Sequence, residues 1–429
     1  MTLNRKTLDR PAAPIRIVHI GLGAFFRAHQ AWYTAIADSK NEWGIAAFTG
    51  RTSTAADLLN QQDCLYTLIT RAADGDSSTV ISSISAAFDG NDFSHFSTAV
   101  ADENVAIVTI TITEAGYTAD QSSAISKLTT ALEIRRIKNA RPIAIVPCDN
   151  IAGNGALLRS LFDQTTSSFS AESRAWFNET VSIVSTSVDR ITPATTQVDI
   201  QSVEAISGYS DLSPVITEPF SSWVLQGEFP LGRPEWERAG AIFVDDIAVY
   251  ESRKLWFLNG AHSLIAYAGL ASGYDTVAEA IADPAIRELV DGFWDEATEV
   301  SESKSDELEA YKAALIVRFA NPRIAHKLGQ IAIDGAVKLR QRVAPIVLKR
   351  SVAGKESQSS ATLIAHWIRF VMTRSDIKDS LSKKISISLQ STHVVRELLA
   401  VIDPKLSTND AFVSLVEEVL SSLSATVKG

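Results

Sequence analysis

Residues 15–27 read IRIVHIGLGAFFR, and this stretch decides the fold expected for the first half of the chain. A β-branched run ends at Gly21, and Gly23 follows two positions later. Glycines at a strand–helix turn let backbone N–H groups approach a pyrophosphate. The full fingerprint has a third glycine where this chain has Phe26, so on this stretch alone an ordinary strand–helix turn stays an open alternative.

Further β-branched runs follow the first strand, and amphipathic helical patterns fill the intervals between them. We expect strands at 44–49, 105–113, 142–147 and 181–185, and helices at 28–38, 53–61 and 122–139. Buried β-branched strands that alternate with helices predict a parallel sheet built from βαβ units. Residues 193–245 contain five prolines, and we expect them to add strands to this sheet.

The second half of the chain has a different pattern. From about residue 247 the apolar residues recur every three to four positions, which predicts helices at 278–300, 305–317, 324–342, 360–372 and 409–423. The apolar stretch 255–273 contains Asn259 and His262, and we interpret it as a buried helix, not a membrane span. The predicted fold class is therefore α/β, with a Rossmann-like dinucleotide-binding domain over 1–245 and a mostly α-helical substrate and catalytic domain over 246–429.

Composition narrows the class of protein. The chain has 429 residues, with 40 Lys and Arg against 50 Asp and Glu, and a net charge of −10. Nucleic-acid-binding proteins usually have a net basic domain, so we expect no nucleic-acid partner. Cys64 and Cys148 make neither a disulfide framework nor a cysteine-rich zinc site. The start of the chain lacks the apolar core of a secretory signal and no stretch predicts a membrane span, so we expect a cytoplasmic protein.

The end of the second expected strand bears on the choice of cofactor. A protein that binds NAD usually has an acidic residue there, which hydrogen-bonds the ribose hydroxyls. Residues 48–52 read FTGRT and contain none. Arg51 could instead meet a 2′-phosphate or stack on adenine, or it could be an ordinary surface arginine. We expect NAD, and NADP stays open.

Residues 250–263, YESRKLWFLNGAHS, are the most informative stretch. On a regular α-helix Glu251, Lys254, Asn259 and His262 fall within an arc of about 140°. An otherwise apolar helix does not bury Lys, Asn and His together without partners. A desolvated lysine can act as a base, and a neighbouring amide can donate to a developing alkoxide. The alternative is a polar stripe that faces solvent.

Tyr250 and Lys254 also fit the Tyr-x-x-x-Lys pair of short-chain dehydrogenases. That interpretation needs a Gly-x-x-x-Gly-x-Gly turn, which this chain lacks, and a serine upstream, where this chain has Glu237. We therefore favour the lysine mechanism over the tyrosine mechanism.

With these residues identified, the sequence resembles the mannitol dehydrogenase family, the polyol-specific long-chain dehydrogenases and reductases. Lys254, Asn259 and His262 match the family signature Lys-(four residues)-Asn-x-x-His. The resemblance extends along most of the chain, through the blocks GLGAFFRAHQ at 21–30, TEAGY at 113–117, CDN at 148–150 with Asn154 and Gly155, VDRI at 188–191 and EPF at 218–220.

The resemblance implies metal-free hydride transfer between a nicotinamide cofactor and a secondary alcohol of an open-chain polyol or sugar acid. It implies that Lys254 is the general acid/base, that Asn150 and Asn259 form the oxyanion hole, and that His262 orients substrate hydroxyls. Asp189 would lie in the substrate pocket, and Glu251 would pass the proton to water. The seven histidines show no metal-ligand spacing, in agreement with metal independence. The cofactor-binding residues that we expect are Gly21, Leu22, Gly23, Ala24, Phe25, Arg51, Thr113 and Glu114.

Residues 321–342 bear on the substrate, which we expect to be a small polyol, ketose or sugar acid. This segment resembles that of hexuronate reductases such as fructuronate reductase, and Lys338 matches a substrate-binding lysine of the family. Gln330 stands where the mannitol enzymes tend to have arginine. Both residues could instead lie on an ordinary helix surface. A polyol-phosphate dehydrogenase and a non-catalytic NAD(P)-sensing protein are the alternative functions, and the sequence predicts no oligomeric state.

Overall fold

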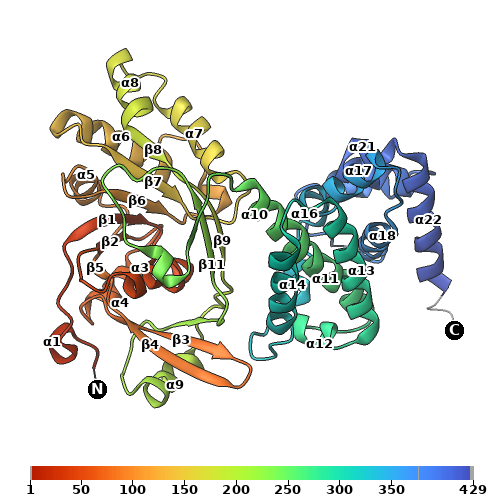
Figure 1. The fold of residues 1–429 in the computed structure, drawn as a ribbon, viewed down its shortest axis with the longest axis horizontal. Coiled ribbons are helices and arrows are strands. Elements are labelled where there is room, and N and C mark those ends of the chain that lie inside the picture. The colour runs from red at the N-terminus through yellow and green to blue at the C-terminus, as the bar shows by residue number, and fades with distance from the viewer. Residues whose placement is uncertain (1, 375, 426–429) are drawn as a thin grey trace. The chain divides into compact units, whose positions relative to one another are not determined.

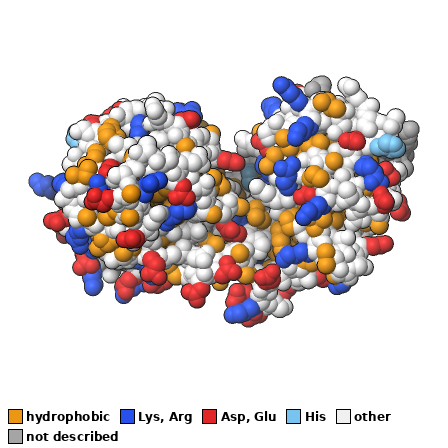
Figure 2. Space-filling view, turned by 90° about the horizontal axis from the view of Figure 1, so that it is seen from above, with side chains coloured by type: hydrophobic (Ala, Val, Ile, Leu, Met, Phe, Trp, Pro, Cys, Tyr) orange, Lys and Arg blue, Asp and Glu red, His pale blue; other side chains and the backbone are white. Residues whose placement is uncertain are grey.

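The computed structural model describes residues 2–374 and 376–425. The chain forms two compact units, Met1–Ile247 and Ala248–Gly429 (Figure 1). Basic and acidic side chains are intermixed on the face shown in Figure 2, in keeping with a modest net charge.

The first unit is built on a six-stranded sheet in which every neighbouring pair is parallel. Its strand order is β5-β2-β1-β6-β7-β8, which is the order of a doubly wound dinucleotide-binding fold. The order reverses between β1 and β6, so the carboxyl ends of these two strands mark the place where such folds bind ligands. The strands are β1 Ile15–Ile20, β2 Gly44–Phe48, β5 Ile84–Phe88, β6 Ile107–Ile110, β7 Ile143–Pro147 and β8 Val181–Ile183.

Helices cover both faces of this sheet. Ile17 of β1 belongs to the core beneath α3 and α4, whereas the next residue, Val18, belongs to the core beneath α5 to α8. Successive side chains of a strand point to opposite faces, so a continuous apolar run is what a sheet covered on both sides requires. The helices are α2 Ala24–Ala28, α3 Gln30–Ala37, α4 Thr54–Asn60, α5 Phe93–Val100, α6 Ala124–Lys138, α7 Asn154–Thr165 and α8 Ala171–Thr180. The α/β class predicted from the sequence is confirmed.

Two small sheets complete the first unit, and here one expectation is wrong. Residues 193–245 do not extend the first sheet: β10 pairs with the hairpin β3–β4, and β11 and β12 join β9. These pairings connect segments far apart in the chain, which local patterns do not specify. The remaining elements are α1 Arg5–Leu8, β3 Tyr66–Ala72, β4 Gly75–Ile81, the 3-10 turn η1 Glu114–Gly116, β9 Ser185–Asp189, α9 Gln197–Ser207, β10 Val215–Thr217, β11 Ser222–Gln226, the 3-10 turn η2 Trp236–Ala239 and β12 Ile242–Phe243.

The second unit is helical, and no strand occurs in the part of it that the structure describes. Its central helix is α11, in which every residue from 261 to 269 is buried, as expected for a buried apolar helix. The helices are α10 Ala248–Arg253, the π-helix η3 Lys254–Gly260, α11 Ala261–Ala271, α12 Val277–Ile281, α13 Pro284–Val300, α14 Ser305–Phe319, α15 Leu328–Ile331, α16 Gly335–Arg342, α17 Ala344–Val352, α18 Gln358–Met372, α19 Ser382–Ser388, α20 Val394–Ile402, α21 Pro404–Ser407 and α22 Asp410–Ala425.

Two helices of this unit differ from their predictions. The helix expected over 278–300 is divided into α12 and α13, because Asp283 caps α13 and Pro284 begins it. The single helix expected over 324–342 is wrong, because α15 and α16 are separate and Asp334 between them has a φ of +56°. A left-handed residue ends one helix and sets a new direction for the next. Among the residues described, no helix combines the length and the apolar character that crossing a bilayer would take.

Candidate active site

The glycine turn after β1 tolerates no side chain at its first position. Gly21 has a φ of +104°, and a Cβ built on it would lie 1.9 Å from the carbonyl oxygen of Thr111. The amides of Gly21 and Leu22 both donate to the carbonyl of Phe48, at 2.9 Å. Gly23 is exposed instead, and a Cβ there would meet nothing closer than 3.6 Å. Gly21 is therefore required by the backbone of the turn, whereas Gly23 leaves the surface beside the turn free of a side chain.

The amides that follow this turn can bind an anion. The first hydrogen bond of α2 runs from the amide of Arg27 to the carbonyl of Gly23. The N–H groups of Gly23, Ala24 and Phe25 precede it, and none of them has an acceptor among the described residues. Such amides satisfy phosphate oxygens in dinucleotide-binding folds.

Phe26, at the position of the missing third glycine, packs against the strand with its ring. It stacks on His19 with ring centroids 3.4 Å apart and an interplanar angle of 7°. His19 is fully buried between the hydroxyls of Thr109, at 2.8 Å, and Thr111, at 3.0 Å. Burial lowers the pKa of this imidazole to about 3, so the ring is neutral. A flat ring stack thus provides the close helix–strand packing for which other sequences use glycine.

Asp149 ties together the ends of β6 and β7. Its carboxylate accepts from the amides of Ile112, at 3.0 Å, and Thr113, at 2.8 Å, and from the hydroxyl of Tyr117, at 2.9 Å. Burial raises the pKa of this carboxyl group, against the lowering effect of the three hydrogen bonds. Thr113 has a φ of +65°, which is rare for a β-branched residue and is typical of functional sites.

The other predicted residues of the first unit lie at two places. Thr113, Glu114, Asn150 and Arg51 are all exposed and follow the carboxyl ends of β6, β7 and β2. Asp189 is half-buried and is instead the last residue of β9, in a different sheet.

Asn154 connects these two places. Its amide donates to the carbonyl of Thr186 at 2.9 Å and accepts from the amide of Thr186 at 3.0 Å. The segment after β7, which carries Asn150, is thereby joined to the strand that ends at Asp189.

The lysine signature lies on a helix that is not α-helical throughout. Lys254–Gly260 is a π-helix, in which each amide bonds to the fifth residue before it. The expectation of one regular α-helical arc is therefore wrong between Lys254 and His262, although the helix is continuous. Two side chains hold the backbone of this segment. The indole of Trp294 donates to the carbonyl of Phe257 at 2.8 Å, and the guanidinium of Arg342 donates to that of Asn259 at 3.0 Å.

His262 is the buried member of the signature, at 8% exposed, whereas Glu251, Lys254 and Asn259 are half-buried. Its ring centroid lies 4.8 Å from that of Phe319 and 5.1 Å from that of His326. Burial, reinforced by nearby basic side chains, holds the pKa of His262 well below its usual value. The imidazole is therefore neutral near pH 7.

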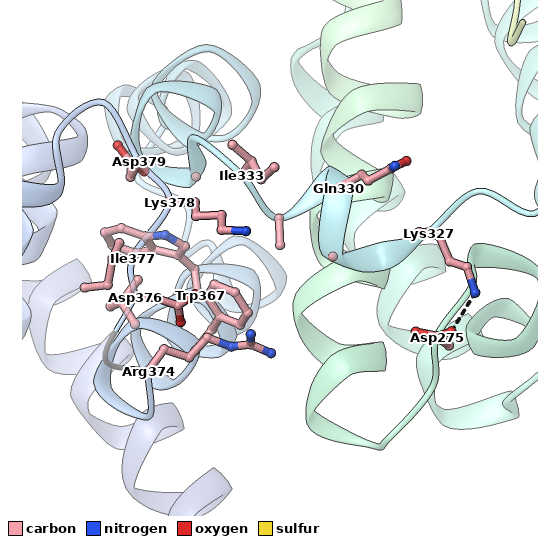
Figure 3. A pocket seen from close by; sticks show the side chains of 15 residues that line it. Asp275, Lys327, Gln330, Ile333, Trp367, Arg374, Asp376, Ile377, Lys378 and Asp379 are labelled. Atoms are coloured by element: carbon pink, nitrogen blue, oxygen red, sulfur yellow. Dashed lines mark hydrogen bonds and ion pairs between the residues drawn. The ribbon is translucent and has the colours of Figure 1, made fainter. Parts of the chain in front are cut away.

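The structure separates Gln330 from Lys338. Lys338 lies on α16, where its Nζ donates to the carbonyl of Ile331 at 3.0 Å. Burial lowers the pKa of its ammonium group to about 8. Gln330 is exposed on α15 and lines a cavity of about 400 Å³ to which Lys338 does not contribute (Figure 3). Figure 3 shows Arg374 and Lys378 extending from the opposite wall of this cavity.

Three residues of these sites were missed from the sequence. Asp149 lies in the CDN block at 148–150, so the sequence offered a signal for it. The contacts of its carboxylate depend on the pairing of β6 with β7, which the sequence does not show. Arg342 ends the quoted segment 321–342, and His326 lies within it. Neither periodicity nor composition distinguishes a buried basic residue of a helix or loop from one on its surface. No group of three or more His, Cys, Asp or Glu side chains suited to a metal ion occurs within the described residues.

A doubly wound domain whose glycine turn leaves amides without protein acceptors, followed by a helical domain with a lysine–asparagine–histidine set, is typical of an oxidoreductase of the dinucleotide-binding class. Comparison with known proteins is more specific. Residues 15–238 match the model of the mannitol dehydrogenase Rossmann domain, and residues 246–424 match that of the mannitol dehydrogenase C-terminal domain. The chain belongs to the mannitol dehydrogenase family.

Individual relatives span nearly the whole chain. D-mannonate oxidoreductase of Escherichia coli (strain K12) is 32% identical over 464 residues, covering 98% of this chain and 95% of that protein. D-arabinitol 4-dehydrogenase of Ralstonia nicotianae is 32% identical over 398 residues, covering 86% and 85%. The solved ternary complex of Pseudomonas fluorescens mannitol 2-dehydrogenase with NAD and D-mannitol has a TM-score of 0.83 at 28% identity, covering 100% and 99%. The expected family is confirmed.

Proposed function

We propose that this chain is a metal-independent dehydrogenase that transfers a hydride between a nicotinamide cofactor and a secondary alcohol of an open-chain polyol or sugar acid. One observation carries the proposal: Lys254, Asn259 and His262 share one continuous helix, in a chain whose two halves both match the mannitol dehydrogenase family. Relatives named for mannonate, arabinitol and mannitol support this substrate class.

The residues after β1 fit a dinucleotide. The open face at Gly23 and the unbonded amides of Gly23, Ala24 and Phe25 suit a pyrophosphate. Thr113 and Glu114, at the carboxyl end of β6, would line the same site at the switch point of the sheet. A nicotinamide cofactor held by these residues would supply the hydride acceptor for oxidation and the hydride donor for reduction. NAD is the cofactor that we propose. The segment after β2 contains Arg51 and no acidic residue, so NADP stays open as the alternative cofactor.

Side chains of this protein would move the proton and hold the oxygen. Lys254 takes the proton from the substrate hydroxyl in oxidation and gives it back in reduction. The side-chain amides of Asn150 and Asn259 donate to the oxygen as it gains negative charge. Glu251, one helical turn before Lys254, passes the proton to water. His262, Asp189, Lys338 and Gln330 would bind the remaining substrate groups.

Steady-state assays with both cofactors test this function. Wild-type protein should form NADH or NADPH with at least one of mannitol, arabinitol and mannonate, and should oxidise the reduced cofactor with the matching keto compound. Lys254→Met should lose at least a hundredfold in kcat, because general acid–base groups contribute about that much. Lys384→Met, which removes an exposed lysine from α19, is the matched control and should keep full activity.

Three results would contradict parts of the proposal. Full turnover in a folded Lys254→Met variant would remove the assigned base. Loss of activity in Tyr250→Phe with retention in Lys254→Met would favour the short-chain tyrosine mechanism. Cofactor binding without turnover of any polyol, polyol phosphate or sugar acid would favour a non-catalytic sensor.

We also propose that the protein works in the cytoplasm. Cys64 and Cys148 are both buried free thiols, which suits a reducing compartment.

A further inference from the structure

The side chains around His262 form a basic group, the cationic cluster, which consists of the uncharged imidazoles of His262 and His326 and the cations Arg318, Lys338 and Arg342. Within the described residues, Arg342 donates only to the carbonyl of Asn259, at 3.0 Å, and to the hydroxyl of Ser263, at 2.9 Å. Lys338 donates to a backbone carbonyl. Neither forms an ion pair with a described carboxylate.

Two ring nitrogens of the cationic cluster also lack partners. Nε2 of His262 and Nδ1 of His326 are both buried, and neither has a hydrogen-bond partner in the described parts of the chain. A buried polar atom without a partner costs free energy, about 1–3 kcal/mol, so native proteins rarely keep one unless a ligand or water completes it. The rings lie 5.1 Å apart, so one ligand group can meet both.

Uncompensated positive charge distinguishes Arg342 from Lys338. The carboxylates of Asp334 and Asp379 act on Lys338 and raise its pKa, against the larger lowering effect of burial and of Arg342. Burial lowers the pKa of Arg342 to about 10, and Tyr267 is the one group that raises it. Arg342 thus has a positive charge that forms no ion pair with a described carboxylate, and a ligand anion would balance it.

We infer that Arg342, together with His262 and His326, binds a terminal carboxylate of the substrate, so that the protein prefers open-chain sugar acids to neutral polyols. This inference rests on the proposed function, because it requires a substrate at Lys254. Arg342 of α16 bonds the backbone of Asn259 in the π-helix, the residue proposed to hold the reacting oxygen, so neighbouring residues can hold both ends of one short substrate. The guanidinium fork matches a carboxylate in two parallel hydrogen bonds.

The ratio of kcat/KM for mannonate to kcat/KM for mannitol and arabinitol tests the inference. Wild type should favour mannonate by at least tenfold. Arg342→Gln removes the charge but can still donate to the backbone, and it should lower this ratio at least tenfold, mainly through KM for the acid. Arg342→Lys should restore part of the preference. His326→Gln supplies a second variant should the first fail to fold.

Arg374→Gln is the matched control. Arg374 is exposed, lines the cavity of Figure 3 and has no ion pair with a described residue, so its loss should leave the ratio unchanged. A drop in the ratio for Arg374→Gln but not for Arg342→Gln would place the anion in that cavity and overturn the inference.

Other outcomes separate this inference from the proposed function. Equal losses for acid and neutral substrates in Arg342→Gln would show that Arg342 only supports the helix, and would overturn the inference. A preference of the wild type for mannitol 1-phosphate would show that the cationic cluster binds a phosphate, and would overturn the inference of a carboxylate. Turnover of neutral polyols alone would refute the inference and leave the proposed function standing, whereas no turnover of any substrate would refute the proposed function itself.

Discussion

The hydrogen bond from Trp294 to the π-helix offers a direct test of how the fold prepares the site. The indole nitrogen of Trp294 donates to the carbonyl of Phe257 at 2.8 Å, in the middle of Lys254–Gly260. Trp294→Phe deletes this donor and leaves a smaller ring in the same core position. We expect the variant to fold, to be less stable and to be a poor catalyst.

The structure sets the size of these effects. Trp294 is 2% exposed, so the deprived carbonyl cannot recover its bond from water, and a buried acceptor without a partner costs about 1–3 kcal/mol. The π-helix fixes the angle between Lys254 and Asn259, and a misplacement of about 1 Å in a reacting group can cost about a hundredfold in rate. We therefore expect kcat to fall between tenfold and a hundredfold.

Trp367→Phe is the matched control. Trp367 lies in the same unit and is 1% exposed, but its indole nitrogen has no hydrogen-bond acceptor among the described residues. Both variants lose the same ring volume, and only Trp294→Phe loses a bond to the π-helix. Urea unfolding should show a free energy of unfolding about 1–3 kcal/mol lower for Trp294→Phe than for Trp367→Phe, and initial rates with saturating cofactor should show the fall in kcat for Trp294→Phe alone.

Two results would refute this reasoning. Wild-type kcat in Trp294→Phe, despite a measurable loss of stability, would show that the π-helix does not depend on the indole. Equal losses of kcat in both tryptophan variants would show that core volume, not the hydrogen bond, controls the site.

Three further predictions concern the first unit. Gly21→Ala places a Cβ 1.9 Å from the carbonyl oxygen of Thr111, so it should abolish cofactor binding and lower the free energy of unfolding by several kcal/mol. Gly23→Ala should keep wild-type stability and weaken NADH binding. Calorimetry measures the stability, and fluorescence titration measures NADH binding. Burial lowers the pKa of His19 to about 3, so between about pH 6.5 and pH 3 this imidazole binds a proton in the unfolded chain but not in the folded chain. The free energy of unfolding should therefore fall as the pH drops through this range. His19→Gln should flatten this pH dependence in urea titrations, and an unchanged slope would contradict the assignment. Arg51→Ala should raise KM for NADP at least fivefold and leave KM for NAD within twofold; a larger effect on NAD would place this guanidinium elsewhere on the cofactor.

Much of the first sheet follows from local sequence. The run at 15–20 is the strand Ile15–Ile20, and the helix expected over 122–139 is Ala124–Lys138, begun by the Ser123 side chain, which accepts from the amide of Ser126. Both rest on signals between near neighbours: β-branched residues that fill two faces of a sheet, and a hydroxyl that caps a helix. The partners of β9 to β12 could not be predicted in this way, because their pairing depends on segments that only the folded chain brings together.

The sequence by itself determined the class of this protein: a glycine turn after a buried strand, an alternating first half, a helical second half, and a lysine–asparagine–histidine spacing that identifies the family. Only the tertiary structure decided the geometry that surrounds these residues. Asp334 breaks the helix that was expected to carry Gln330 and Lys338 together, and Trp294 and Arg342 hold the backbone of a π-helix where a regular α-helix was expected. The reason is physical: periodicity is set by neighbours three or four residues apart, whereas burial and charge compensation depend on groups that meet only after folding.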